Sequence, residues 1–218
     1  MVATTLHLLR HGEVHNPTGV LYGRLPGYHL SERGHAMAAL VADHLAGGRG
    51  AERADVTVVI ASPLQRAQET AGPIAAAFGV DVRTDENLLE AENQFQGLTF
   101  GVGDGSLRHP QHWPLLRNPF RPSWGEPYEK QVARMRAALD AAREAARGHQ
   151  AVLVSHQLPI WVTRLAFENR RLWHDPRRRQ CSLASLTSLH YEDDRFAGLT
   201  YSEPAAELLP GAARVAGA

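Results

Sequence analysis

Two short apolar runs constrain the fold of this chain most. Residues 56–61 form a continuous, β-branched run between Asp55 and Ser62, and residues 151–155 form a second run that ends at His156. Runs of strand length without polar alternation are typical of strands that are buried on both faces, as in a parallel sheet. A third apolar strand, residues 4–9, is predicted near the N-terminus. Amphipathic helical patterns separate the three. The sequence therefore predicts an α/β fold: a three-layer sandwich with a mostly parallel central sheet and helices on both faces.

The expected helices begin and end at recognisable signals. Ser31 is a suitable N-cap for a helix that ends at Gly47–Gly48. Ser62 as N-cap and Pro63 as first helical residue predict a second helix that ends at Gly79. Further elements are predicted as a strand at 80–83, helices at about 128–147 and 159–168, and a hairpin of strands 183–191 and 195–201.

One domain is expected over residues 1–218, with an irregular lid inserted at about 93–127. The lid segment is rich in proline and tryptophan and shows no helical or strand period. Long irregular segments inside a compact domain are often functional. The tail from 203 to 218 is rich in Ala, Pro and Gly and is expected to be peripheral.

Composition limits the partners and the compartment. Lys and Arg together number 23, as do Asp and Glu, so no global charge favours nucleic acid or a membrane surface. The single cysteine, Cys181, permits no internal disulfide and is interpreted as a small buried side chain at a strand start. With no basic residue before the apolar stretch of residues 1–9, we expect no signal peptide and a cytoplasmic protein.

Charged and titratable residues follow the predicted strands directly. The first strand leads into Arg10 and His11, the second into Ser62 and, one helical turn later, Arg66, and the third into His156. The carboxyl ends of parallel strands meet at one edge of a sheet, which is where ligands bind in open α/β folds. Two arginines, two histidines and a helix N-terminus at one edge predict an anion site with an imidazole in its middle.

A phosphoryl group suits such a site best. Its transfer requires positioning and charge neutralisation, which guanidinium and imidazolium groups can provide without a metal. A histidine can also attack phosphorus and form a phosphohistidine. The attacking imidazole must be neutral, and the neighbouring Arg10 and Arg66 should lower the pKa of His11.

Four blocks of sequence, spread over residues 6–165, resemble the histidine phosphatase superfamily, which includes phosphoglycerate mutases and related acid phosphatases. They are Leu-Arg-His-Gly-Glu at 9–13, Ser-Pro-Leu-Gln-Arg-Ala-Gln-Glu-Thr at 62–70, Leu-Glu at 89–90 and Val-Ser-His at 154–156. The resemblance implies that His11 is phosphorylated and that Arg10, Arg66 and His156 complete the phosphate pocket. It also implies that Asn16 contacts phosphate and that Glu90 protonates the leaving group, with Glu92 as the alternative donor.

Further substrate contacts are expected from Gly23 and Arg24 in the loop after His11, from Ser62, and from Gln157. Gln157 stands where the family often has glycine, which would narrow the pocket. The paired arginines with which the mutases hold a substrate carboxylate have no clear counterpart. Lid residues that would substitute for them are Arg108, Arg117 and Arg121.

These departures favour a phosphomonoester hydrolase that acts on a small phosphorylated metabolite through a phosphohistidine. The alternatives are a phosphoglycerate mutase-like phosphoryl transfer and a phospho-ligand binder without catalysis. No cofactor is expected. No metal is expected either, because Gly12 and Asn16-Pro17 prevent His7, His11 and His15 from sharing one helical face.

Two surface features complete the predictions. A basic cluster is interpreted as a solvated patch; its members are Arg170, Arg171, Arg177, Arg178 and Arg179. An exposed edge strand is expected near Leu183, and such a strand would let two chains pair as a homodimer.

Overall fold

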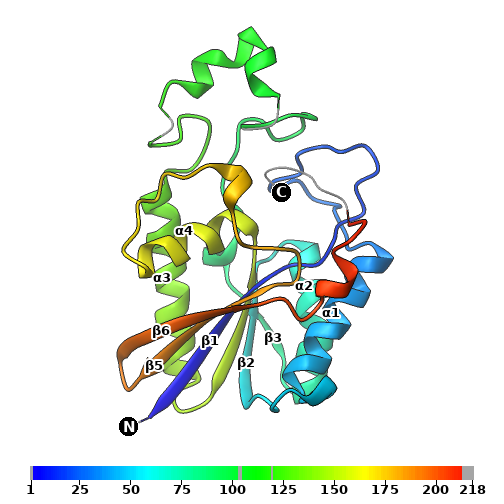
Figure 1. The fold of residues 1–218 in the computed structure, drawn as a ribbon, viewed down its shortest axis with the longest axis vertical. Helices are drawn as coiled ribbons and strands as arrows, with labels where there is room; N and C mark the ends of the chain where they lie inside the picture. The colour runs from blue at the N-terminus through cyan, green and yellow to red at the C-terminus, as the bar shows by residue number, and fades with distance from the viewer. Residues whose placement is uncertain (1, 103–104, 119, 213–218) are drawn as a thin grey trace.

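A six-stranded sheet forms the middle layer of the protein (Figure 1). The structure is a computed structural model that describes residues 2–102, 105–118 and 120–212. Across the sheet the strands are β3 (Val82–Thr84), β2 (Val56–Ala61), β4 (Gln150–Ser155), β1 (Ala3–Arg10), β5 (Leu186–Glu192) and β6 (Arg195–Ser202).

Four of these strands are parallel. β3, β2, β4 and β1 pair in parallel, whereas β5 pairs antiparallel with β1 and with β6. The prediction of a mostly parallel sheet is therefore confirmed. The prediction of an edge strand near Leu183 is wrong, because β5 lies between β1 and β6 and the hairpin at Asp193–Asp194 places β6 at the edge. A homodimer stays a prediction.

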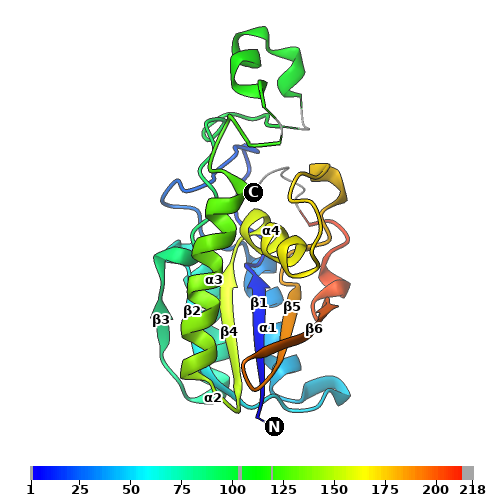
Figure 2. The same ribbon diagram turned by 90° about the vertical axis from the view of Figure 1, so that its left-hand side faces the viewer.

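Two pairs of helices cover the two faces of the sheet, as the three-layer prediction requires (Figure 2). α1 (Glu32–Leu45) and α2 (Gln65–Phe78) cover one face, and α3 (Tyr128–Ala145) and α4 (Gln157–Phe167) cover the other. Neighbouring strand residues alternate between the two cores: Leu9 and Val154 pack under α1 and α2, while Leu8 and Leu153 pack under α3 and α4. This two-residue alternation is the pleat of strands that are buried on both sides.

The start of α2 differs from the prediction. α2 begins at Gln65, its N-cap position is Leu64, and no side chain caps it. Ser62 is fully buried, and its hydroxyl contacts His156 at 2.9 Å. The same hydroxyl accepts from the Leu64 amide at 3.4 Å, so it bonds the turn before the helix and does not cap the helix itself. At α1 the prediction is confirmed, since the Ser31 hydroxyl accepts from the Gly34 amide.

The loop after β1 packs tightly against the first turn of α1, because both backbones carry glycine there. A Cβ at Gly34 would lie 2.0 Å from the Glu13 carbonyl oxygen, and one at Gly12 would lie 2.6 Å from the Gly34 carbonyl oxygen. This contact fixes the backbone that directly follows His11. It has no room for a methyl group.

We expect Gly34→Ala to lower the free energy of unfolding by about 1–3 kcal/mol, the usual cost of overpacking. Gly72→Ala in α2 is the matched control, because nothing lies within 4 Å of its added Cβ. The control should gain about 0.5–1 kcal/mol from helix propensity. Urea unfolding of both variants checks the pair, and equal effects would contradict the packing argument.

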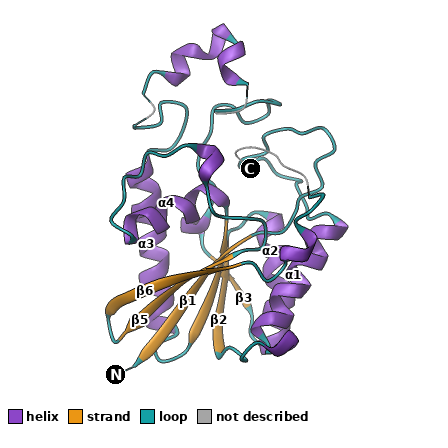
Figure 3. Cartoon of the chain, in the orientation of Figure 1, coloured by secondary structure: helices purple, strands orange, loops and turns teal. Residues whose placement is uncertain are grey.

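The segment between β3 and α3 rises beyond the carboxyl ends of the parallel strands (Figures 1 and 3). Its base is closed by backbone pairing, since the Gln94 amide donates to the Trp124 carbonyl and the Glu126 amide to the Glu92 carbonyl. Beyond the base, the described residues form two short 3-10 helices at Ser106–Arg108 and Pro110–Leu116. We call residues 93–127 the lid segment.

The described part of the tail contacts the body. Ala205 is buried, and Leu208 and Leu209 pack against the core under α1 and α2. The rest of the predicted tail, 213–218, lies outside the described residues. Among the described helices, none has both the length and the apolar character needed to cross a membrane.

Candidate active site

The register of the sheet places three strand ends side by side. β4 lies between β1 and β2, with Arg10 opposite Ser155 and Ala61 opposite Val154. The next residues in the chain are therefore neighbours: His11, Ser62 and His156. Backbone bonds hold them, as the His11 amide donates to the Ser155 carbonyl and the Ser62 amide to the Val154 carbonyl. The convergence predicted from the sequence is present.

His11 is fully buried, and its hydrogen bonds settle which nitrogen carries the proton. Nδ1 lies 2.8 Å from the Gly12 carbonyl oxygen, which can only accept, so Nδ1 carries the hydrogen. Nε2 then has the lone pair and accepts from Arg66 Nε at 3.3 Å. Burial, with the charges of Arg66 and Arg10, holds the pKa of His11 well below its ordinary value. The imidazole is thus neutral at neutral pH, as a nucleophile must be.

The two arginines of the pocket are held by backbone carbonyls. Arg66 donates from Nη2 to the Gly23 carbonyl at 2.6 Å, and its guanidinium lies 4.7 Å from the centre of the Tyr22 ring. Arg10 donates from Nη1 to the Cys181 carbonyl at 2.8 Å. Both side chains are buried. These contacts fix the directions of both guanidinium groups.

Cys181 itself is buried, as predicted, but it precedes β5 by several residues instead of starting the strand. Burial raises the pKa of its thiol to about 11. The thiol is therefore protonated at neutral pH and is not a nucleophile.

His156 lies against His11, with 5.2 Å between the ring centroids. Its Nε2 contacts the Ser62 hydroxyl at 2.9 Å, and its Nδ1 is buried with no hydrogen-bond partner within the described chain. Burial, followed by the charge of Arg66, holds the pKa of His156 well below its ordinary value. A bound phosphate dianion would act in the opposite direction and favour the imidazolium.

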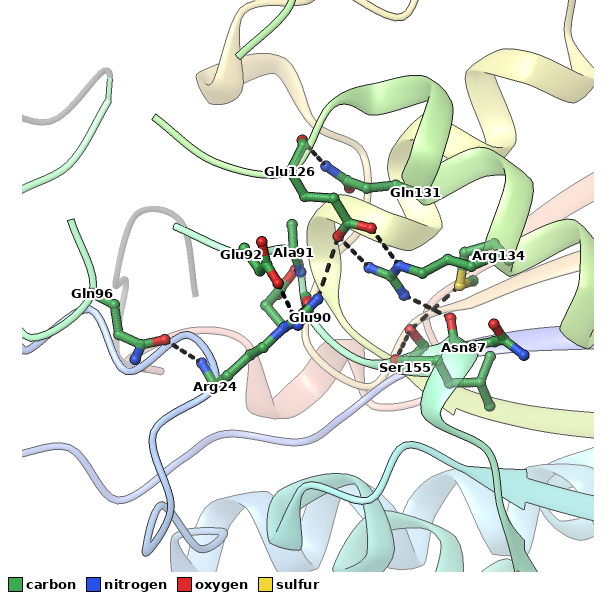
Figure 4. Close-up of polar contacts among 12 residues, drawn as sticks. Arg24, Asn87, Glu90, Ala91, Glu92, Gln96, Glu126, Gln131, Arg134 and Ser155 are labelled. Carbon is green, nitrogen blue, oxygen red and sulfur yellow. Dashed lines mark hydrogen bonds and ion pairs between the residues drawn. The ribbon is translucent and has the colours of Figure 1, made fainter. Parts of the chain in front are cut away.

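Glu90 is buried at the end of a segment whose carbonyls are clamped by side chains from three elements (Figure 4). Arg134 of α3 donates to the Asn87 carbonyl at 2.6 Å, Ser155 of β4 to the Leu88 carbonyl at 2.8 Å, and Arg24 to the Glu90 carbonyl at 2.6 Å. Burial raises the pKa of Glu90. Burial of this clamped carboxyl therefore favours its protonated form.

Glu92 has a different environment. Its side chain is 68% exposed, and it forms an ion pair with Arg24 Nη1 at 3.2 Å. Arg24 also reaches Glu126 at the base of the lid segment, and Glu126 binds Arg134 through both carboxylate oxygens (Figure 4). Arg24 therefore ties the loop after β1 to the Glu90 segment and to the lid base. Its predicted contact with substrate stays a prediction.

Asn16 and Gly23 also lie in the loop after β1. The Asn16 amide closes its own turn, donating to the Val20 carbonyl and accepting from the Val20 amide. Its phosphate contact stays a prediction. Gly23 supplies the carbonyl that orients Arg66, and its φ of 40° suits glycine.

A small cavity of about 40 Å³ lies on the Glu90 side of the pocket. Gly23 and Gln157 line it together with the lid residues Trp124 and Gly125. Cavities that enclose small-molecule ligands are about 300–1,000 Å³. His11 is fully buried and does not line this cavity.

The lid arginines that were considered as substitutes for the mutase pair do not line this cavity. Arg108, Arg117 and Arg121 are exposed. No cluster of three or more His, Cys, Asp or Glu side chains that could hold a metal ion is found within residues 2–102, 105–118 and 120–212.

Arg179 does line the cavity, and the sequence did not indicate this. The interpretation of Arg179 as part of a solvated patch is wrong, because its guanidinium donates to Gln157 Oε1 and His174 Nε2. The interpretation holds for Arg177, which is exposed and pairs with Asp175.

A second missed residue is Thr70, whose hydroxyl accepts from the Gly12 amide. Thr70 is the last residue of the sequence block at 62–70, and its place in that block is the one sequence feature that indicated it.

The neutral buried histidines make stability depend on pH. The pKa values of His11 and His156 are lowered in the folded state, so below about pH 6.5 the unfolded chain binds more protons and stability falls as pH decreases. Glu90, whose pKa is raised, acts in the opposite direction above its ordinary value of 4.5. Because two histidines act against one carboxyl, the free energy of unfolding decreases as the pH is lowered from about 7 to 5.

We expect His156→Gln to make the free energy of unfolding less dependent on pH, by up to about 1.4 kcal/mol per pH unit. Urea unfolding in phosphate-free buffer at several pH values measures the slope. His15→Gln, in an exposed loop position, is the control and should leave the slope as in the wild type. An unchanged slope in His156→Gln would show that His156 is not held neutral by the fold.

Known proteins are similar to this chain in sequence and in fold. A family model described as "Histidine phosphatase superfamily (branch 1)" matches residues 6–204. "Uncharacterized protein Rv0525" of Mycobacterium tuberculosis is 59% identical over 93% of this chain and 98% of its own length. "Phosphoserine phosphatase 1" of Hydrogenobacter thermophilus is 27% identical over 87% of this chain and 88% of its own length.

Among solved structures, a mycobacterial glucosyl-3-phosphoglycerate phosphatase superposes with a TM-score of 0.71 at 24% identity, covering 92% of this chain and 98% of that one. This likeness confirms the α/β fold. The family model covers nearly the whole chain, from residue 6 to residue 204. The chain therefore belongs to the histidine phosphatase superfamily.

Proposed function

We propose that the protein is a phosphomonoester hydrolase that acts on a small phosphorylated metabolite through a phosphohistidine at His11. The observation that supports this most is the state of His11: a neutral imidazole, with its proton on Nδ1 and its Nε2 lone pair next to Arg66. An incoming phosphoryl group would replace the Arg66–His11 hydrogen bond with bonds from Arg66 and Arg10 to its own oxygens.

The first step forms one bond and breaks another. The lone pair of His11 Nε2 attacks phosphorus, and the bond from phosphorus to the ester oxygen breaks. Glu90, whose protonated form is favoured by burial, gives its proton to the departing oxygen. Arg10, Arg66 and His156 hold the equatorial oxygens, where charge is concentrated.

The second step regenerates the enzyme. The Glu90 carboxylate takes a proton from a water molecule, the water oxygen attacks phosphorus, and the bond to His11 Nε2 breaks to release inorganic phosphate. The Glu90 side chain is buried, whereas the Glu92 side chain is exposed. This difference favours Glu90 over Glu92 as the proton donor and acceptor. The lid arginines lie outside the cavity, and this supports hydrolysis over a mutase reaction.

The test is a rapid neutral quench of the wild-type protein with nitrophenyl phosphate, followed by intact-protein mass spectrometry and an assay of inorganic phosphate. We expect a phosphoryl adduct and free phosphate, both also in the presence of a metal chelator. A phosphoryl group that moves to a second position of a substrate without release of phosphate would indicate a mutase. A folded protein with neither adduct nor phosphate release would refute the proposal.

A further inference from the structure

The base of the lid segment holds a shielded carboxylate between two arginines (Figure 4). Glu126 accepts from Arg134 Nε at 2.8 Å and from Arg134 Nη2 at 2.9 Å, and its Oε2 also lies 3.4 Å from Arg24 Nη2. The Glu126 side chain is only 11% exposed. Its backbone is held as well, since its amide donates to the Glu92 carbonyl and its carbonyl accepts from Gln131 Nε2. A two-pronged, shielded ion pair of this kind is stronger than an exposed one.

The same two arginines hold the backbone before and after the Glu90 side chain. Arg134 Nη1 donates to the Asn87 carbonyl at 2.6 Å, and Arg24 Nε donates to the Glu90 carbonyl at 2.6 Å. Arg24 also pairs with Glu92, but that carboxylate is exposed. Among the described residues, Glu126 is the one carboxylate that pairs with both arginines. A change at Glu126 therefore reaches the Glu90 segment from two directions.

The direction of the Glu90 carboxyl depends on this backbone. The carboxyl is buried, and its Oε1 accepts from the amide of the next residue, Ala91, at 2.8 Å. The peptide group between Glu90 and Ala91 thus carries both the carbonyl that Arg24 holds and the amide that orients the carboxyl. A proton donor must lie within hydrogen-bond reach of the atom that it protonates. A shift of this peptide group would move the carboxyl away from that position.

We propose that Glu126 is a positioning residue for the proton donor: through Arg24 and Arg134 it holds the backbone that aims the Glu90 carboxyl at the leaving oxygen. This inference rests on the proposed function and adds a form of regulation to it. Glu126 belongs to the lid segment, so proton donation depends on the position of the lid base. Chemistry that needs no proton donor does not share this dependence.

The charge of Glu126 acts in the same direction as its geometry. Several ionisable groups lie around Glu90: Arg66 of α2, Arg134 of α3, Arg179, Tyr22 and Cys181. The three arginines favour the charged form of Glu90, whereas burial favours the protonated form and is the larger influence on its pKa. Glu126 compensates the charge of Arg134. Its removal should therefore lower the pKa of Glu90.

The experiment uses Glu126→Gln, which keeps the shape of the side chain and removes its charge, and two substrates with different leaving groups. For phosphoethanolamine, whose alkoxide needs a proton, kcat/KM should fall by about tenfold to a hundredfold, the usual effect of losing hydrogen bonds to a charged group. For nitrophenyl phosphate, kcat/KM should change by less than about threefold. The alkaline decline of kcat/KM for phosphoethanolamine should move to lower pH.

Three further variants separate positioning from a general loss of structure. Glu129→Gln changes an exposed carboxylate in the first turn of α3 and should behave as the wild type. Glu126→Asp keeps the charge and should recover part of the rate. Glu126→Gln should cost less in an Arg134→Met background than in the wild type, because both changes act on one clamp. Equal losses on both substrates, or fully multiplicative effects of the two changes, would overturn the inference.

Hydrogen exchange distinguishes failure of this inference from failure of the proposed hydrolysis. The Ala91 amide, which donates to the Glu90 carboxyl, reports the clamp without any turnover. Its exchange, followed by NMR, should be about tenfold or more faster in Glu126→Gln and unchanged in Glu129→Gln. Faster exchange supports the clamp even if the wild type hydrolyses neither substrate. Unchanged exchange in Glu126→Gln overturns the inference whether or not the protein is a hydrolase.

Discussion

His11→Ala is expected to abolish the phosphoryl adduct and to reduce kcat for any phosphate monoester by about 10³-fold or more. The reason is that His11 Nε2 accepts from the pocket arginine Arg66, whereas Nε2 of the other neutral pocket histidine, His156, contacts the Ser62 hydroxyl. The His11 ring lies between Arg66 and His156, and the proton on Nδ1 leaves Nε2 as its nucleophile. Removal of the nucleophile of a serine protease costs about 10⁶ in kcat. The measurement is steady-state phosphate release beside intact-protein mass spectrometry.

Two controls accompany this variant. His15→Gln changes an exposed histidine in the same loop and should retain both adduct and turnover. A tryptic digest of the trapped wild type at neutral pH separates peptide 11–24, which carries His11, from peptide 148–164, which carries His156. Fragmentation should place the phosphoryl group on His11. A phosphoryl group on His156, or a folded His11→Ala protein that keeps a tenth of the activity, would contradict the assignment.

The convergence of Arg10, His11, Ser62, Arg66 and His156 could be predicted because it depends on short-range patterns. Each of these residues follows an apolar strand, and parallel strands end at one edge of a sheet by geometry. The register of β1, β4 and β2 then makes the strand ends neighbours.

The start of α2 could not be predicted in the same way. Ser62 and Pro63 are good starting residues for a helix, but the Ser62 hydroxyl contacts His156, which is distant in the sequence.

The Glu90 side of the site depends on contacts without a local signal. Three side chains that clamp the segment come from the loop after β1, from β4 and from α3 (Figure 4). Arg179 belongs to an arginine-rich stretch in which Arg177 is solvated, and composition does not distinguish the two. What separates them is the position of Gln157 and His174. The sequence therefore indicates the residues at the strand ends better than those around the neighbouring cavity.

The second large effect is expected for Glu90→Gln, which removes the proton donor and keeps the shape of the side chain. The kcat/KM for phosphoethanolamine, whose alkoxide leaves poorly without a proton, should fall by about 10²–10⁴, the usual contribution of general acid catalysis. For nitrophenyl phosphate, whose leaving group is a weak base, the fall in kcat/KM should be much smaller. With that substrate the phosphoenzyme should accumulate, because its hydrolysis needs the Glu90 carboxylate to take a proton from water.

The pH profile gives an independent test of the same role. Burial raises the pKa of Glu90, so the protonated form that the first step needs is present below that pKa and is lost as pH rises through it. Wild-type kcat/KM for the alkyl phosphate should therefore decline on the alkaline side, and Glu90→Gln should lack this decline. Glu92→Gln, in which an exposed carboxylate is changed, should keep both the rate and the decline. If Glu92→Gln instead shows the leaving-group dependence, then Glu92 and not Glu90 is the proton donor.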